Sequence, residues 1–306
     1  MLSRSELLKR LEVPKEGKLS VILDTDAYNE IDDQFAICYM LANTDRFDIK
    51  GICAAPFFNE RSSSPKDGEE KSYRELERIL DVTGKSELLN NIYHGSHSFL
   101  QDSKTPVESD AANFIVKTAN EMPENQLLYV VAIGAITNVA SAILTDPSIV
   151  DKIVVVWLGG HDIHWPDNRE FNCFQDTKSA AVVFDCGVPL IQAPCMGVIS
   201  HFSTTEPELR KELKGKNEIC DYLYETSMFW KEEHHCTDYF SKVYWDVVPV
   251  AYLRNPDFCG TKIISSPIIT DRHVYGFDDR RHPIKYIYWL NRDEIFHDLF
   301  TKMQNF

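Results

Sequence analysis

Short apolar runs alternate along this chain with segments whose apolar residues recur at helical spacing. The apolar runs lie at 19–23, 48–54, 128–133, 152–158 and 189–193. The helical patterns lie between them, at 31–43, 69–83, 110–121, 135–145 and 177–185. Such alternation is typical of βαβ units, in which helices cover both faces of a parallel sheet. The pattern therefore predicts an α/β fold with a mostly parallel central sheet flanked by helices.

The C-terminal third departs from this alternation. Residues 206–245 predict mostly helical structure with polar and aromatic side chains, which would cover the sheet edge or a site. The run 284–290 predicts a strand, and 292–304 predicts a closing helix. Neither a low-complexity linker nor an internal repeat divides the 306 residues, so we expect a single domain, 1–306. In such sheets ligands bind at the carboxyl ends of the strands.

Charge and composition restrict the partners. The net charge of −15 argues against nucleic acids and membrane surfaces, because both attract clustered lysines and arginines. No uncharged run approaches the roughly 20 residues of a membrane-spanning helix. The polar segment 1–17 does not resemble a secretory signal peptide. The eight cysteines form no Cys-x-x-Cys pair, and most lie among apolar residues, as reduced thiols do. We therefore expect a cytoplasmic protein.

Four aspartates crowd the junction between the first apolar run and the first helical pattern: Asp24, Asp26, Asp32 and Asp33. Like charges packed this closely repel each other unless protons or a cation neutralise them. A hard divalent metal ion with oxygen ligands is the simplest neutraliser. Helix capping, or the attraction of acids to the positive end of a helix, would explain one or two of these residues but hardly four.

Two other acidic motifs can be compared with this turn. An EF-hand loop counted from Asp24 would need a glycine at its sixth position and a glutamate at its twelfth, but these positions hold Asn29 and Phe35. A haloacid-dehalogenase-type phosphatase would have Thr or Val two residues after its second aspartate, where this chain has Tyr28. The first motif is therefore excluded, and the second is weak.

Further polar residues follow the apolar run 152–158. Two adjacent glycines at 159–160 permit a tight turn and close approach of the backbone to a ligand. In an extended segment, Glu170 and Asn172 would project to the same side, where a carboxylate and an amide suit a vicinal diol. An ordinary polar loop is the alternative. Asp246 stands alone in an apolar stretch, where either metal ligation or helix capping would satisfy its carboxylate.

Taken together, these residues resemble the nucleoside hydrolase family, the inosine/uridine-preferring N-ribohydrolases. Members open with a strand followed by Asp-x-Asp-Pro-Gly-x-Asp-Asp. The corresponding acids here are Asp24, Asp26, Asp32 and Asp33, with two extra residues and no Pro-Gly between the pairs. The resemblance runs from about residue 19 to 252 and includes Ile136-Thr137-Asn138, Gly159-Gly160, Glu170-Phe171-Asn172, Asp176 and Asp246. It implies a Rossmann-like core, a small-molecule nucleoside substrate that is split into ribose and base, and a homodimer or homotetramer.

The resemblance also implies a role for each matched acid. One calcium ion would be bound by Asp26, by Asp33 in bidentate fashion, by Asp246 and by the backbone carbonyl of Ile133. Asp26 would in addition act as the general base toward a water molecule. Asp24 would support the metal-binding loop from behind. The ribose hydroxyls would be held by three further side chains: Asp32, Glu170 and Asn172.

The surroundings of the base depart from the family pattern. Trp245 stands where many members have an acidic histidine that protonates the leaving base. An indole cannot supply that proton but can stack on an aromatic base, so we expect Trp245 to bind substrate in this way. Help for the leaving group would then come from a tyrosine, from solvent or from one of five histidines: His161, His164, His201, His234 and His235.

Two asparagines that contact substrate in the family are also replaced. One falls at about Phe57, with Asn59 two residues further on, and the other is replaced by His164, which is therefore a candidate substrate contact. These changes leave two alternatives to an ordinary ribonucleoside hydrolase. One is a hydrolase for a modified or unusual ribosyl compound, and the other is a non-catalytic, calcium-dependent sugar-binding protein.

Overall fold

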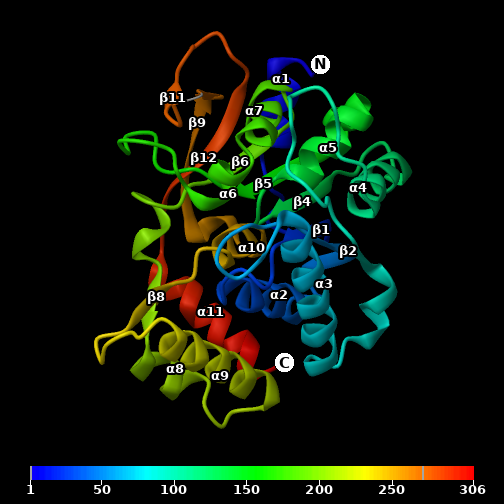
Figure 1. Ribbon diagram of the computed structural model, residues 1–306. Coiled ribbons are helices and arrows are strands. Elements are labelled where there is room, and N and C mark those ends of the chain that lie inside the picture. The colour runs from blue at the N-terminus through cyan, green and yellow to red at the C-terminus, as the bar shows by residue number, and fades with distance from the viewer. Residues whose placement is uncertain (1, 271) are drawn as a thin grey trace.

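The computed structural model describes residues 2–270 and 272–306. An eight-stranded sheet forms its centre, with strand order β3-β2-β1-β4-β5-β6-β12-β9 (Figure 1). All neighbouring strands are parallel except β9, which pairs antiparallel with β12 at one edge. The strands span Leu19–Thr25 (β1), Phe47–Ala54 (β2), Ile92–Tyr93 (β3), Leu128–Ala132 (β4), Ile153–Leu158 (β5), Leu190–Ala193 (β6), Cys259–Ser265 (β9) and Pro283–Leu290 (β12). The predicted α/β fold with a mostly parallel sheet is confirmed.

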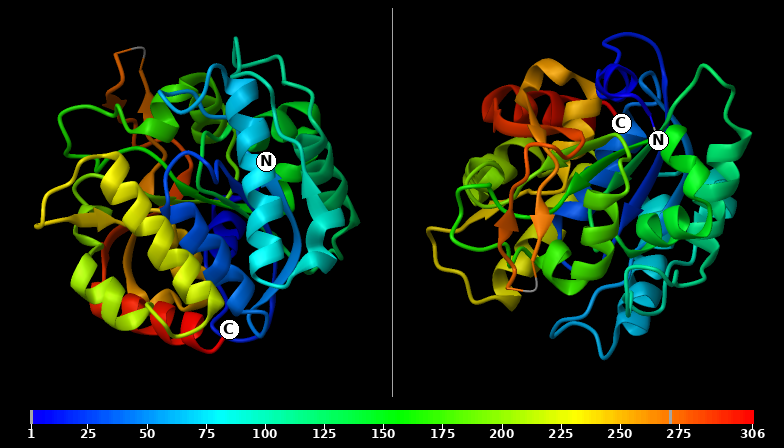
Figure 2. Two further views of the ribbon diagram at one scale, coloured as in Figure 1. Left: turned by 60° about the horizontal axis from the view of Figure 1, so that its bottom comes forward. Right: turned by 90° about the horizontal axis from the view of Figure 1, so that it is seen from above.

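Helices cover both faces of this sheet (Figures 1 and 2). The core on one face includes α2, α10 and α11, and the core on the other includes α4, α5 and α7. Side chains of β1 alternate between them, since Val21 and Leu23 join the first core and Ile22 joins the second. These six helices span Asp32–Ala42 (α2), Asp110–Glu121 (α4), Thr137–Thr145 (α5), Thr177–Asp185 (α7), Val247–Arg254 (α10) and Arg292–Gln304 (α11).

Smaller elements surround the layers. The other helices are α1 (Arg4–Arg10), α3 (Pro65–Val82), α6 (Phe171–Gln175), α8 (Glu206–Glu212) and α9 (Glu218–Glu233). Antiparallel pairs join β7 (Ser203–Thr205) to β8 (Ser241–Val243) and β10 (Ile268–Ile269) to β11 (Tyr275–Gly276). Short 3₁₀ helices span Ser86–Asn91, Pro147–Asp151, Ile199–His201 and Pro256–Phe258. Within the described part of the chain, no helix has the length and apolarity that crossing a membrane requires.

Most predicted boundaries hold within two residues, and α4, α7 and α11 match the predicted ranges residue for residue. Helix α3 begins at Pro65 rather than at residue 69, because the Ser64 side chain accepts a hydrogen bond from the Asp67 N–H and caps the helix. Helix α1 was not predicted, although Ser3 and Glu6 form a capping box there. Edge strand β9 was not predicted either, since half-exposed residues interrupt its apolar pattern.

The strand order determines where a ligand site can form. From β1 the chain passes to β2 and β3 on one side, then returns to β4 on the other side and continues to β5 and β6. Open α/β sheets bind ligands where the order reverses in this way, outside the carboxyl ends of the strands. Asp26 directly follows β1, and Ile133 directly follows β4. The acidic turn therefore lies at this reversal point.

Candidate functional site

A cavity of about 190 Å³ opens at the carboxyl edge of the sheet, beside the ends of β1, β4 and β5. It contains seven of the residues predicted from the sequence: Asp26, Asp32, Ile133, Glu170, Asn172, Trp245 and Asp246. Its other lining residues are Asn29, Glu30, Leu158, His161, Arg169, Phe171, Cys195 and Met196. Residues more than 200 positions apart in the sequence thus meet in one small space.

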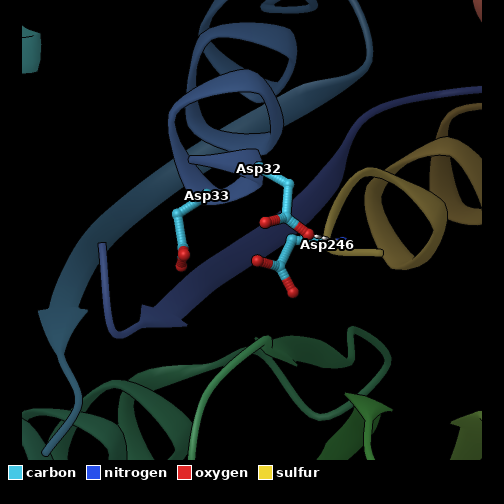
Figure 3. A group of neighbouring side chains, drawn as sticks. All are labelled: Asp32, Asp33 and Asp246. Atoms are coloured by element: carbon cyan, nitrogen blue, oxygen red, sulfur yellow. Dashed lines mark hydrogen bonds between the residues drawn. The ribbon is translucent and has the colours of Figure 1, made fainter. Parts of the chain in front are cut away.

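Asp32 and Asp246 line this cavity, and Asp33, which does not line it, lies close to both of them (Figure 3). Asp32 and Asp33 occupy the first turn of α2, where the positive end of the helix dipole favours acids. Asp246 directly precedes α10, and its backbone N–H donates to Asp32 Oδ2 at 3.3 Å. One carboxylate oxygen of each residue lies within 4.8 Å of the others. Neither α2 nor α10 has a side-chain cap, so capping does not account for these acids.

Burial and mutual repulsion make these carboxyl groups hard to ionise. All are at most 5% exposed. Burial, and then the charge of Asp32, raise the pKa of Asp33 to about 7. Burial and the neighbouring acids likewise raise the pKa of Asp26 and Asp246 well above the ordinary value. Such a group is costly to hold in its charged form unless a cation is bound.

Two further observations fit a cation that prefers oxygen ligands. Within the described residues, Asp24 Oδ2 and Asp26 Oδ2 are buried without a hydrogen-bond partner. The other oxygen of Asp24 accepts from Asn138 Nδ2 at 2.7 Å, and burial raises the pKa of Asp24 to about 7. Thr25 donates to Asp33 Oδ1 at 2.5 Å. The donor set is therefore entirely oxygen, as hard divalent cations require.

One ammonium group partly balances this charge. Lys242, on β8, forms ion pairs with Glu30 and, at 3.4 Å, with Asp32. Burial alone would lower the pKa of Lys242, but Asp32 and Glu30 raise it above its ordinary value, so the side chain stays protonated. Burial would raise the pKa of Glu30, but Lys242 brings it below its ordinary value. A single lysine does not neutralise the remaining buried acids.

The segment with Glu170 and Asn172 is not extended, which corrects the expectation from its sequence. Glu170 is the N-cap of α6, and its carboxylate accepts the backbone N–H groups of Gly160, Asn172 and Cys173 at 2.9 Å. These charge-assisted bonds satisfy the start of α6 and favour helix over strand. The Asn172 amide donates at 3.1 Å to the carbonyls of Ile133 and Leu158. Both residues therefore line the cavity and also hold its walls together.

Some candidate residues lie elsewhere. His164 is exposed and is not among the lining residues. Phe57 is fully buried in the protein interior. Asn59 does not line the cavity, but its Nδ2 donates to Asn29 Oδ1 at 2.7 Å. Of the five candidate histidines, His161 alone lines the cavity, and burial lowers its pKa.

Several lining residues were not identified from the sequence. Cys195 and Met196 lie two and three residues after the end of β6, so the apolar run at 189–193 marks their place at the same sheet edge. Glu30 and Asn29 belong to the extra residues between the two acidic pairs. No periodic signal places their side chains, because this segment is a turn outside helix and strand.

Comparisons with known proteins agree with this geometry. The family model described as "Inosine-uridine preferring nucleoside hydrolase" matches residues 21–294. The chain is 27% identical over 231 residues to "Probable uridine nucleosidase 2" of Arabidopsis thaliana, a match that covers 66% of this chain and 67% of that protein. It is 27% identical to the "Pyrimidine-specific ribonucleoside hydrolase RihA" of Citrobacter koseri, over 57% of this chain and 59% of that relative's length. A solved plant nucleoside hydrolase shares the fold, with a TM-score of 0.75 at 18% identity over 94% of this chain and 99% of that one.

Proposed function

The chain belongs to the inosine-uridine preferring nucleoside hydrolase family, and we propose that it hydrolyses the N-glycosidic bond of a ribonucleoside with the help of one calcium ion. The observation that carries the proposal is the group of buried carboxylates at the carboxyl edge of the sheet, three of them within 4.8 Å. The products are ribose and the free base, and no organic cofactor takes part.

The proposed calcium ligands are Asp26, Asp33, Asp246 and the Ile133 carbonyl. The all-oxygen donor set and the unpartnered Asp26 Oδ2 support this choice. Asp32 also belongs to the close group of carboxylates, so the ribose position lies directly beside the metal position. A bound divalent cation would supply Lewis-acid polarisation and neutralise the acids.

The chain's own residues divide the remaining work. Asp26 Oδ2 faces no donor in the described structure and accepts the proton of the attacking water as general base. Asp32, Glu170 and Asn172 line the same cavity and position the ribose. Positive charge grows on the sugar as the bond to the base breaks, and the nearby carboxylates stabilise it. Asp24, behind Asp26, keeps the turn in place through Asn138.

Replacement of the proposed base tests the proposal. Ribose release from a panel of nucleosides is measured for the wild type with calcium, the wild type with a chelator, and the Asp26→Asn variant. We expect loss of activity with the chelator and a decrease in kcat of about 10²–10⁴-fold in Asp26→Asn. Asp151→Asn is the matched control, since Asp151 is exposed and lies two residues before β5, at the opposite edge of the sheet.

Three results would contradict the proposal. Full activity after exhaustive chelation would show that the reaction does not need a metal ion. An active preparation in which elemental analysis finds no calcium would show the same. Near-normal turnover of Asp26→Asn with calcium bound would show that Asp26 is not the general base. Calcium-dependent binding of ribose without hydrolysis of any riboside would show that the chain is a sugar-binding protein and not a hydrolase.

A further inference from the structure

The cavity is rich in hydrogen-bond acceptors. Five acidic side chains line it: Asp26, Glu30, Asp32, Glu170 and Asp246. An ionised carboxylate accepts hydrogen bonds and donates none. A sugar hydroxyl that donates its proton to a carboxylate still has an oxygen that can accept, and a donor beside the carboxylate completes its pairing. Binding of a polyol here is therefore favoured by hydrogen-bond donors beside the acids, and the side-chain amides of the cavity wall are candidates for this role.

Asn172 is not free to be this donor, although its Oδ1 can still accept a hydrogen bond from a ribose hydroxyl. Its Nδ2 carries two protons, and both are used in 3.1 Å hydrogen bonds to the carbonyls of Ile133 and Leu158. The other side-chain amide in the cavity wall is that of Asn29, which is 8% exposed. Among the described residues, Asn29 Nδ2 has no hydrogen-bond partner. This nitrogen is also not completely buried. It can therefore reach a ligand.

Two successive hydrogen bonds fix the orientation of the Asn29 amide. The backbone N–H of Arg61 can only donate, and it donates to Asn59 Oδ1 at 2.9 Å. Asn59 Nδ2 consequently faces Asn29 and donates to its Oδ1 at 2.7 Å. Because Asn29 Oδ1 is occupied, Nδ2 is the end of this amide that remains for a ligand.

The backbone around Asn29 is also held. Its N–H donates to the Asp26 carbonyl at 2.7 Å, which closes a tight turn. Its carbonyl accepts from Arg61 Nη1 at 3.3 Å, and the Arg61 guanidinium lies 4.7 Å from the centre of the Tyr28 ring. These contacts keep the turn in one conformation, so little ordering is needed when a ligand binds.

We propose that Asn29 Nδ2 donates a hydrogen bond to a hydroxyl oxygen of the substrate's sugar, and that Asn59 is the positioning residue that turns this donor toward the sugar. The same hydroxyl donates a hydrogen bond to a carboxylate of the cavity wall. This inference rests on the proposed function and adds a determinant of sugar selectivity to it. The extra residues between the two acidic pairs thus contribute directly to substrate binding.

The experiment compares a ribonucleoside with its 2′-deoxy and 3′-deoxy analogues. The ribonucleoside is the one that the wild type hydrolyses fastest, and kcat/KM is measured for the wild type and for Asn29→Ala. A lost hydrogen bond of this kind changes kcat/KM by about 10–100-fold. We expect that loss with the ribonucleoside and a loss of less than about threefold with one deoxy analogue, because that analogue lacks the bonded hydroxyl.

A second variant tests the role of Asn59. Asn59→Asp keeps an acceptor for the Arg61 N–H but replaces the Nδ2 donor by an oxygen, so the Asn29 amide turns over and directs its own oxygen at the cavity. We expect Asn59→Asp to reproduce the selectivity of Asn29→Ala, although Asn59 does not line the cavity. Asn91→Ala is the matched control, since Asn91 donates its amide to the Lys50 carbonyl outside the cavity wall.

Equal losses with all three substrates, or unchanged kinetics in a folded Asn29→Ala variant, overturn the inference. Asn29→Asp has nearly the same shape without the donor and repeats the test if Asn29→Ala does not fold. Calorimetric titration with ribose gives a readout that does not depend on turnover. Weaker ribose binding by Asn29→Ala than by the wild type supports the inference, whether or not the wild type hydrolyses a riboside. Absence of hydrolysis by the wild type would refute the proposed function but not this inference. Equal ribose affinity refutes the inference.

Discussion

At the residue scale, Trp245 is the side chain that we expect to contact the leaving base. Its indole lines the cavity directly before Asp246 and is half-buried. It cannot protonate a base, but it can stack on one and exclude water. His161 is the candidate histidine that lines the cavity, and burial lowers its pKa, so it is mostly neutral at pH 7. Neutral imidazole is a weaker acid than imidazolium, and we therefore expect modest assistance to the leaving group.

This arrangement predicts a preference for leaving groups that need no proton. The wild type should hydrolyse a nitrophenyl riboside with a much higher kcat than inosine. Trp245→Ala should raise KM more than it lowers kcat, because stacking contributes to binding of the base. Steady-state kinetics on both substrates measure these effects, with Trp289→Ala as the control, since Trp289 is 49% exposed and outside the cavity wall.

Two results would contradict this prediction. Comparable kcat values on both substrates, with a bell-shaped pH profile that loses its basic limb in His161→Gln, would show an effective general acid. Unfolding of Trp245→Ala at lower temperature, with unchanged kinetics, would show that the indole only packs against the core.

How far single residues could be predicted depends on where their partners lie. The carboxylates of Asp26 and Asp32 were found because local pattern alone puts them where a strand ends and a helix begins. The free donor of Asn29 could not be found in this way. Its orientation depends on Asn59 and on the backbone of Arg61, about 30 positions away, and only the folded chain brings them together.

At the scale of elements, α2 and α10 point their first turns at the same cavity. Both are packed in the same core, and almost every residue of α2 is buried. Lys242 on β8 connects this pair to the preceding turn through Asp32 and Glu30. Its ammonium lies 5.1 Å from the centre of the Trp230 ring on α9, so β8 and α9 are joined to the site as well.

Removal of this ammonium should destabilise the fold. Lys242→Met leaves a buried carboxylate without its cation, and we expect the free energy of unfolding in chelator to fall by about 3 kcal/mol. Lys231→Met is the control, because the ion pair of Lys231 with Glu206 is more exposed and should contribute less than about 1 kcal/mol. Urea denaturation measures both. Equal, small losses would show that Lys242 is not needed to balance the acids.

Elements with a clear period were predicted, and those defined by tertiary contacts were not. Helices α4 and α7 each have one apolar and one polar face, and this periodic pattern suffices to locate them. The helical turn at Glu170 was predicted as extended, because its capping depends on Gly160 and on the end of β5. Edge strand β9 forms through its pairing with β12, a partner that follows it in the chain and gives it no periodic signal.

At the scale of the whole molecule, the parallel topology of the sheet concentrates acidic side chains at one edge. The sheet brings strand ends from residues 25, 132, 158 and 193 to one edge, where the site combines them with Asp246. Folding thus gathers carboxyl groups that are far apart and solvated in the unfolded chain. The repulsion between these carboxylates is relieved when they bind protons or a metal ion, and which of the two is bound depends on pH.

This balance gives a prediction for the stability of the metal-free protein. The pKa of Asp24 and of Asp33 is about 7 in the folded chain and close to the ordinary 3.8 when unfolded. The folded state therefore binds more protons between these values, so this contribution to stability is complete below about pH 4 and is lost as the pH rises to about 7. In chelator, Tm should fall between pH 5 and 7.5. Calcium should raise Tm, and more so at pH 7.5 than at pH 5, because it competes with these protons.

Calorimetric scans with chelator and with excess calcium at both pH values measure this linkage. Burial lowers the pKa of His161 and of His282, which adds a contribution of opposite sign near pH 6.5, so a variant must isolate the acids. Asp33→Asn removes one titrating carboxylate and one proposed ligand, and it should flatten the fall of Tm and abolish most of the calcium response. A Tm in chelator that rises steadily with pH, or a calcium shift of equal size at both pH values, would show that these carboxylates neither hold protons nor exchange them for the ion.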